Sequence, residues 1–234
     1  MQYYSTNDKA LRVSFKDALF SGMPEDKGLY MPKDIPDLSS FFKGNTHLSF
    51  QEIGYLIASQ FIDKELSIND LHEIIENSIT FDAPNKYIYD SIFCLELFHG
   101  PTFAFKDFGA RFMARCMEKF IHLNNQTTNI LVATSGDTGS AVAHGFYDVE
   151  GINVIILYPK GKVSQIQEKQ LTTLDKNIYA LEIEGTFDDC QRLVKKAFLD
   201  RNIKNKINIS SANSINIARL IPQSFYYVHS YMQL

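Results

Sequence analysis

The chain passes from a strand pattern to a helix pattern within one short stretch, Asn129-Ile130-Leu131-Val132-Ala133-Thr134-Ser135-Gly136-Asp137-Thr138-Gly139-Ser140-Ala141-Val142-Ala143-His144. The apolar run at its start predicts a buried strand, and the small polar residues that follow predict a turn. The remainder predicts a helix at 139–147.

The same alternation extends over most of the chain. We predict strands at 92–97, 129–134, 152–158, 178–183 and 207–210, and helices at 107–122, 139–147, 163–173, 187–200 and from about 214 to the end. Alternating elements with nearly continuous apolar strands favour the α/β class: a mostly parallel sheet with helices on both faces and right-handed crossovers. Such sheets bind ligands at the carboxyl ends of their strands, so the strand-to-helix turns are the candidate sites.

The first 90 residues have a different, mainly helical pattern. Ser49-Phe50-Gln51-Glu52 predicts a capping box that opens a helix to about Phe61, and Ser67-Ile68-Asn69-Asp70 predicts a second helix to about Glu76. Prolines and glycines make 21–37 an irregular connection. We therefore expect a smaller, mainly helical domain at 1–90, followed by an α/β domain at 91–234.

Composition limits the classes of partner. The 234 residues are 45% apolar and 21% charged, with a net charge of −4, so nothing indicates binding to nucleic acid or to a membrane surface. Cys94, Cys116 and Cys190 are widely spaced, which favours neither a disulfide framework nor a metal site. With no apolar signal segment at the amino terminus, we expect a cytoplasmic protein.

Lys106 lies in a nearly uncharged aromatic stretch, Phe98-His99-Gly100-Pro101-Thr102-Phe103-Ala104-Phe105-Lys106-Asp107-Phe108. An ammonium among Phe103, Phe105 and Phe108 would lose hydration, which favours the neutral amine that acts as a nucleophile or base. Lysines that form Schiff bases occupy such settings. The alternative is a lysine that opens a helix and extends its charged end into water, and this stretch alone leaves both open.

The turn after the strand at 129–134 is a candidate anion site. Its hydroxyls, Gly136, Gly139 and backbone N–H groups gather at the start of a helix, which favours a carboxylate or phosphate. It is neither a P-loop nor a GxGxxG turn. The alternative is that Ser135 or Thr138 simply caps the helix while the glycines form the turn.

A third polar turn, Ser210-Ser211-Ala212-Asn213-Ser214-Ile215-Asn216, follows the strand at 207–210. A helix cap explains one or two of its polar side chains but not the whole run. Three polar turns, one with a desolvated lysine, indicate an amino-acid-sized anionic ligand beside a Schiff-base cofactor.

These segments resemble the motifs of threonine synthases, pyridoxal-phosphate enzymes of the tryptophan-synthase β-like fold (fold type II). Residues 99–109 resemble the lysine motif of that family, 133–141 its substrate-carboxylate loop, and 26–32 a segment of its first domain. Residues 210–216, with Ala218, Arg219, Pro222 and Gln223, resemble a third signature. Order and spacing match, and the resemblance covers nearly the whole chain.

The resemblance implies a carbon–oxygen lyase that converts O-phospho-L-homoserine and water into L-threonine and phosphate. Lys106 would bind pyridoxal 5'-phosphate as a Schiff base and carry protons, and Asp137 would lie near the 3-hydroxyl of the cofactor. The implied substrate-binding residues are Thr134, Ser135, Gly136, Thr138 and Gly139 for the α-carboxylate, and Asn213, Ser214, Asn216 and Arg219 for the phosphate side.

One departure from the family pattern concerns completeness. Family members continue past this point, and their glycine- and asparagine-rich loop for the cofactor phosphate has no counterpart in residues 1–234. We therefore expect an amino-terminal portion that binds the cofactor weakly and turns over slowly. The alternatives are a threonine-synthase-like phosphate-releasing lyase and a noncatalytic α/β binding module, and the sequence leaves open whether the protein is a monomer or a homodimer.

Overall fold

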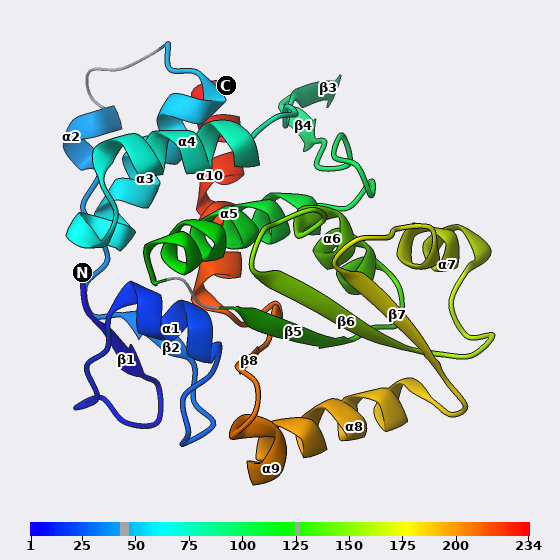
Figure 1. Cartoon of the computed structure of the whole chain (residues 1–234). Helices are drawn as coiled ribbons and strands as arrows, with labels where there is room; N and C mark the ends of the chain where they lie inside the picture. The colour runs from blue at the N-terminus through cyan, green and yellow to red at the C-terminus, as the bar shows by residue number, and fades with distance from the viewer. Residues whose placement is uncertain (43–46, 125–126) are drawn as a thin grey trace.

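A four-stranded parallel sheet forms the centre of the larger part of the chain (Figure 1). The computed structural model describes residues 1–42, 47–124 and 127–234. The strands are β5 (Thr128–Ala133), β6 (Ile152–Pro159), β7 (Ile178–Ile183) and β8 (Ile209–Ser210), in the order β7-β6-β5-β8. Thr128 pairs with Ile152 and Ala133 with Leu157 in parallel register, which confirms the predicted parallel sheet.

The strand order reverses next to β5. The chain moves outward from β5 through β6 to β7, and β8 then returns to the other side of β5. In open parallel sheets such a reversal opens a crevice between the loops that leave the two neighbouring strands. The turns after β5 and β8 are the second and third polar turns of the sequence, so the topology places both at this crevice.

Helices cover both faces of the sheet, as predicted. In Figure 1, α5 (Lys106–Asn124), α6 (Asp137–Gly145) and α7 (Gln165–Thr172) lie above the strands, and α8 (Phe187–Leu199) lies below them. The short α9 (Arg201–Lys204) follows α8, and α10 (Ile217–Met232) packs on α5. Ile130, Val154 and Phe112 are fully buried in the core, and Ile130 and Val154 point to the same face of the sheet because they are paired in register.

The strand predicted at 92–97 is not part of this sheet, and that part of the prediction is wrong. β4 (Ile92–Leu95) instead pairs antiparallel with β3 (Asn85–Tyr89) in a separate two-stranded hairpin. Ile92 and Phe93 are each 45% exposed. Asp90 adopts a positive φ of 50°, the left-handed conformation of tight hairpin turns, and an apolar run alone does not identify its pairing partner.

The amino-terminal part is mainly helical, with α1 (Phe15–Ser21), α2 (Ser39–Phe42), α3 (Phe50–Ile62), the short 3₁₀ helix η1 (Asp63–Glu65) and α4 (Ile68–Ser78). The predicted capping box is confirmed, since Ser49 and Glu52 satisfy each other's backbone N–H groups. The Ser67 side chain caps α4 in the predicted way. A small antiparallel pair, β1 (Tyr3–Ser5) with β2 (Tyr30–Pro32), was not predicted.

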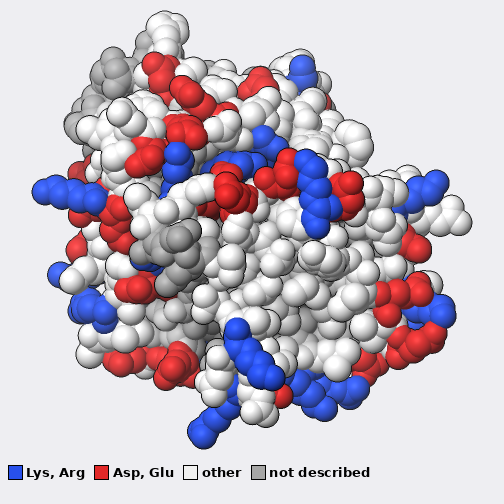
Figure 2. Space-filling view, in the orientation of Figure 1, with Lys and Arg blue, Asp and Glu red and all other residues white. Residues whose placement is uncertain are grey.

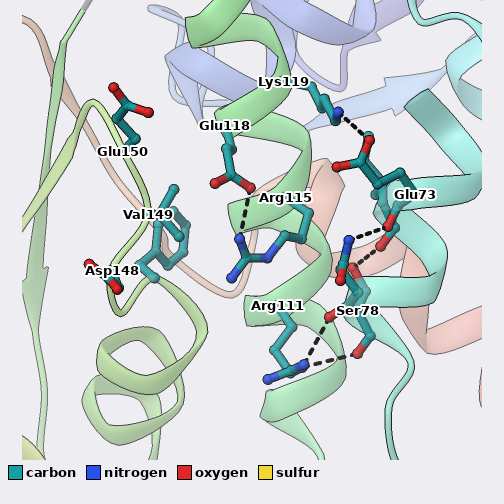
Figure 3. A network of polar contacts seen from close by, with 12 residues as sticks. Glu73, Ser78, Arg111, Arg115, Glu118, Lys119, Asp148, Val149 and Glu150 are labelled. Carbon is teal, nitrogen blue, oxygen red and sulfur yellow. Dashed lines mark hydrogen bonds and ion pairs between the residues drawn. The ribbon is translucent and has the colours of Figure 1, made fainter. Parts of the chain in front are cut away.

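Polar contacts fix α5 against α4, as Figure 3 shows. The Arg111 guanidinium donates from Nε to the Ser78 carbonyl (3.1 Å) and from Nη2 to the Asn77 carbonyl (2.8 Å). Lys119 Nζ donates to Glu73 Oε2 at 2.6 Å. Because Lys106 is the first residue of α5, these contacts also hold the lysine-bearing helix in place.

The domain division at residue 90 stays a prediction, since one buried cluster includes both parts.

Charged residues of both signs are interspersed on the face shown in Figure 2, and the area over the strands is mostly uncharged. No helix in the described part of the chain has the length and apolar character that crossing a membrane requires. The cytoplasmic location stays a prediction from the sequence.

Candidate active site

Lys106 and Asp137 form an ion pair between the amino termini of α5 and α6. Lys106 Nζ lies 3.6 Å from Asp137 Oδ2, and the lysine side chain is 21% exposed. A cation at the first residue of a helix faces the positive end of the helix dipole, so the Asp137 carboxylate compensates an unfavourable position. Because the carboxylate offsets the ammonium, the preference of this corner for an anion rests on the free N–H groups of the two helix amino termini.

The aromatic surroundings of Lys106 differ from the prediction. The Phe105 ring lies beneath the ammonium, with its centre 4.6 Å from Nζ, at a distance typical of a cation–π contact. Phe103 is 74% exposed and Phe108 is only 3% exposed, in the core. The expectation that all three rings surround the lysine is therefore wrong, because the helix begins at Lys106 and turns Phe108 toward the core.

Thr134 organises the turn after β5. Its buried Oγ1 accepts hydrogen bonds from the backbone N–H groups of Gly136 (3.0 Å) and Gly139 (2.9 Å). Gly136 is the residue that precedes α6, and as a glycine it has no side chain with which to cap the helix. The alternative that Ser135 or Thr138 caps this helix is wrong, since the hydroxyl of Thr134 takes that role from inside the turn.

The other hydroxyls of this turn are left for a ligand. Ser135 is exposed and Thr138 is half-buried, and neither side chain has a hydrogen-bond partner among the described residues. The N–H groups of Asp137 and Thr138 begin a helix, so they have no acceptor within it. Hydroxyls and free N–H groups at one helix end are suited to bind a carboxylate.

Asp137 is held from a third helix. Its Oδ1 accepts a hydrogen bond from Gln167 Nε2 on α7 at 2.5 Å, while its Oδ2 faces Lys106. The Asp137 side chain is 55% exposed. Gln167 was not predicted from the sequence as a site residue. Its one signal is its place three residues after Ser164, the helix-capping residue of α7.

The turn after β8 is fastened to the amino-terminal part of the chain. Ser210 Oγ donates to the Phe20 carbonyl at 2.7 Å. Asn216 is fully buried, donates from Nδ2 to the Leu19 carbonyl (2.8 Å) and accepts from the Ala218 N–H (3.0 Å). Both polar ends of Asn216 are thus engaged within the protein, whereas Asn213 and Ser214 are exposed.

Arg219 lies buried beneath this turn, on α10. The residue is 4% exposed, and its guanidinium donates from Nη1 to the Ala212 carbonyl at 2.8 Å. Burial lowers the pKa of Arg219 to about 10, and the nearby Asp107 opposes that shift. A Cβ at Gly109 would lie 3.1 Å from Arg219 Nε, so this glycine lets the lysine-bearing helix and Arg219 approach closely.

The structure thus brings together part of the predicted site. Lys106 contacts Asp137 directly, the residues 134–139 surround the same helix end, and Arg219 packs on α5. Among the described residues, Lys106 has no hydrogen bond or ion pair with the exposed Asn213 or Ser214, and the substrate role of these two residues stays a prediction. Buried Asp107, which accepts from the N–H (2.9 Å) and the hydroxyl (2.6 Å) of Thr102, was not predicted as part of the site framework.

Two family models match the chain. Residues 2–79 match "Threonine synthase N terminus", and residues 81–228 match "Pyridoxal-phosphate dependent enzyme". The second match covers more than half of the chain and includes Lys106, the turn after β5 and the turn after β8.

Curated relatives and solved structures agree with these matches. A threonine synthase from Buchnera aphidicola (subspecies Schizaphis graminum) is 46% identical over 99% of this chain and 54% of the relative. The crystal structure of threonine synthase from Escherichia coli superposes with a TM-score of 0.88 at 43% identity, over 100% of this chain and 54% of that one. A pyridoxal-phosphate-bound threonine synthase from Brucella melitensis gives a TM-score of 0.93 at 35% identity, over 99% and 52%. The chain spans about half the length of the curated relatives it matches.

Proposed function

The chain belongs to the family of pyridoxal-phosphate-dependent enzymes, and we propose that it corresponds to the amino-terminal half of a threonine synthase with Lys106 as the cofactor-binding lysine. The observation that carries the proposal is the ion pair of Lys106 with Asp137, 3.6 Å apart, in which Asp137 begins α6 directly after the turn that follows β5. The threonine synthase matches extend over both the helical and the α/β parts of the chain.

The described residues fit pyridoxal phosphate. Its aldehyde requires a primary amine, which Lys106 supplies from a mostly covered position. Its 3-hydroxyl requires a polar neighbour, and Asp137 stands beside the lysine. When bound, the cofactor supplies an electron sink for substrate carbanions.

The remaining residues of the site act on the substrate. Ser135, Gly136, Thr138 and Gly139 bind its α-carboxylate through hydroxyls and the free N–H groups of the α6 terminus, and Thr134 holds that turn in shape. Arg219, with Asn213 and Ser214, supplies the positive and polar groups for the phosphate side. The Lys106 amine takes and returns protons at the substrate carbons.

The proposed reaction converts O-phospho-L-homoserine and water into L-threonine and phosphate. The name shared by the relatives, threonine synthase, supports threonine as the product. Incubation with O-phospho-L-homoserine tests it: threonine as the product supports the synthase, whereas 2-oxobutyrate identifies the phosphate-releasing lyase.

Trapping with borohydride tests the role of Lys106 directly, because reduction fixes even a weakly bound cofactor to its lysine. We expect mass spectrometry to find the reduced cofactor on the Lys106 peptide, and Lys106→Ala to remove that label. Lys160→Ala is the control, since Lys160 forms an exposed ion pair with Glu184. Labelling of other lysines with Lys106 unmodified would overturn the proposal.

A further inference from the structure

We propose that Gln167 is a positioning residue that holds the Asp137 carboxylate toward Lys106. This inference deepens the proposed function and rests on it for the role of Lys106. Gln167 touches neither the lysine nor, in the proposal, the substrate. It acts through Asp137.

The two oxygens of the Asp137 carboxylate have separate partners. Oδ1 accepts from Gln167 Nε2 at 2.5 Å, and Oδ2 lies 3.6 Å from Lys106 Nζ. Because the aspartate side chain is 55% exposed, it would be free to rotate in water without a fixed partner. The hydrogen bond from Gln167 fixes one oxygen and thereby orients the other toward the ammonium.

Two hydrogen-bond partners, Ser164 and Asp137, determine the orientation of the Gln167 side-chain amide. Ser164 Oγ donates to Gln167 Oε1 at 3.0 Å, and the same Oγ accepts from the Gln167 N–H at 3.4 Å. An ionised carboxylate only accepts hydrogen bonds, so the amide nitrogen must face Asp137. The start of α7 thus sets the direction in which Gln167 donates.

The position three residues after the cap is used differently in α7 than in other helices of this chain. Asp17, Glu52 and Asp189 occupy it in α1, α3 and α8, where each carboxylate closes a capping box. Gln167 does not close one, and its side chain reaches across to α6 instead. A carboxylate there would face Asp137 with like charge, whereas glutamine both accepts from Ser164 and donates to Asp137.

Gly136 leaves the space that this contact needs. A Cβ on Gly136 would lie 2.5 Å from both Nε2 and Oε1 of Gln167, closer than any real contact. The Gly136 φ of 147° is also a conformation that other residues rarely adopt. The glutamine amide therefore lies directly over the turn that leads to Asp137.

The test measures the reactivity of the Lys106 amine in the cofactor-free chain. Trace labelling with acetic anhydride between about pH 6 and pH 10, read out by mass spectrometry of the Lys106 peptide, gives its pH profile. Asp137 is the carboxylate that forms an ion pair with Lys106 within the described residues, so its orientation sets the charge that stands beside the Lys106 amine. We expect Gln167→Leu to increase Lys106 labelling about two- to five-fold at neutral pH, the range for a partly exposed ion pair.

Two comparisons make the result specific. Gln170→Leu on the same helix is the matched control, because the Gln170 side chain has no hydrogen bond to Asp137, and it should leave the profile unchanged. In an Asp137→Asn background, Gln167→Leu should cause no further change.

An unchanged profile in Gln167→Leu, or an equal change with and without Asp137, would overturn the inference. Circular dichroism confirms that each variant is folded. The assay uses no cofactor, so its failure is separate from a failure of borohydride trapping to label Lys106.

Discussion

Asn216 Nδ2 donates a hydrogen bond of 2.8 Å to the carbonyl oxygen of Leu19, a residue 197 positions earlier in the chain. The Oδ1 atom of the same side chain accepts from the Ala218 N–H and caps α10. One buried amide therefore fixes the turn after β8 to the end of α1 and sets where α10, with Arg219, begins. The turn at 210–216, which the sequence predicts to bind substrate, therefore also connects the amino-terminal part of the chain to α10.

Replacing Asn216 by alanine should lower the free energy of unfolding by about 2 kcal/mol. The change removes a helix cap and leaves the buried Leu19 carbonyl without its donor. Urea denaturation measures the loss. Asn213→Ala is the control in the same turn, because Asn213 is exposed, and it should change stability by less than about 0.5 kcal/mol. Equal losses would show that the Leu19 contact contributes nothing.

Replacing Arg111 by methionine should destabilise the protein by about 1–3 kcal/mol, because the carbonyls of Asn77 and Ser78 lose a charged donor. Methionine keeps most of the apolar stem, so the effect isolates the guanidinium. Arg115→Met is the matched change on the same helix. Within the described residues, the Arg115 guanidinium bonds to Glu118 alone, three residues away, and its loss should cost about 0.2–0.5 kcal/mol. Chemical denaturation of both variants distinguishes the two effects.

Gly136→Ala should lower the free energy of unfolding by about 2–3 kcal/mol. The added Cβ both collides with Gln167 and requires a φ of 147° in a residue with a side chain. Gly161→Ala is the comparison at a positive φ without a neighbouring side chain. Gly161 also has a positive φ, of 65°, but a Cβ there meets nothing within 4 Å, so only backbone strain of about 1–2 kcal/mol applies. If both substitutions cost the same in urea denaturation, the contact with Gln167 is not rigid.

Stability should fall as the pH falls below about 6.5, in part because of His144. Burial lowers the pKa of His144, and Asp107 only partly opposes this shift. Below the pKa of the unfolded chain, the unfolded state binds a proton that the folded state does not, so acid favours unfolding. The contribution is absent above that pKa and grows as the pH falls toward the lower, folded-state pKa.

Urea midpoints at about pH 7.5 and about pH 5.5 measure this dependence. His144→Gln should lose less stability between the two pH values than the parent chain does. His47→Gln, at an exposed position, should lose as much as the parent. A dependence that is identical in all three proteins would assign the effect to other groups.

The strands of the sheet were predictable because each is a nearly continuous apolar run that is bounded by polar or turn-forming residues. The expected strands at 129–134, 152–158 and 178–183 agree with β5, β6 and β7 to within one residue at each end. The run at 92–97 is equally apolar but forms an exposed hairpin instead of a strand of this sheet. An apolar run does not specify whether its pairing partner is a neighbouring strand or a distant one. The small pair of β1 with β2 is too short for a periodic signal.

For the candidate site residues, too, local features could be predicted from the sequence and long-range contacts could not. The position of Lys106 before a helix and of the polar turns after strands could be predicted, because turn residues and helix starts are local features. The sequence could not predict which hydroxyl caps α6. Thr134, rather than Ser135 or Thr138, accepts from the N–H groups at the start of this helix. The position of the Gln167 side chain over Gly136 could not be predicted either, because it depends on how α7 packs beside α6.

The sequence by itself determined the α/β class, the strand-to-helix turns and the candidate residues for the reactive and anion-binding roles, because hydrophobic period and turn chemistry act over a few neighbouring residues. Only the tertiary structure decided which of those groups meet: Lys106 with Asp137, Asp137 with Gln167, and Asn216 with Leu19. Such contacts join residues 30 to 197 positions apart, and they depend on strand order and helix packing, which no local pattern specifies.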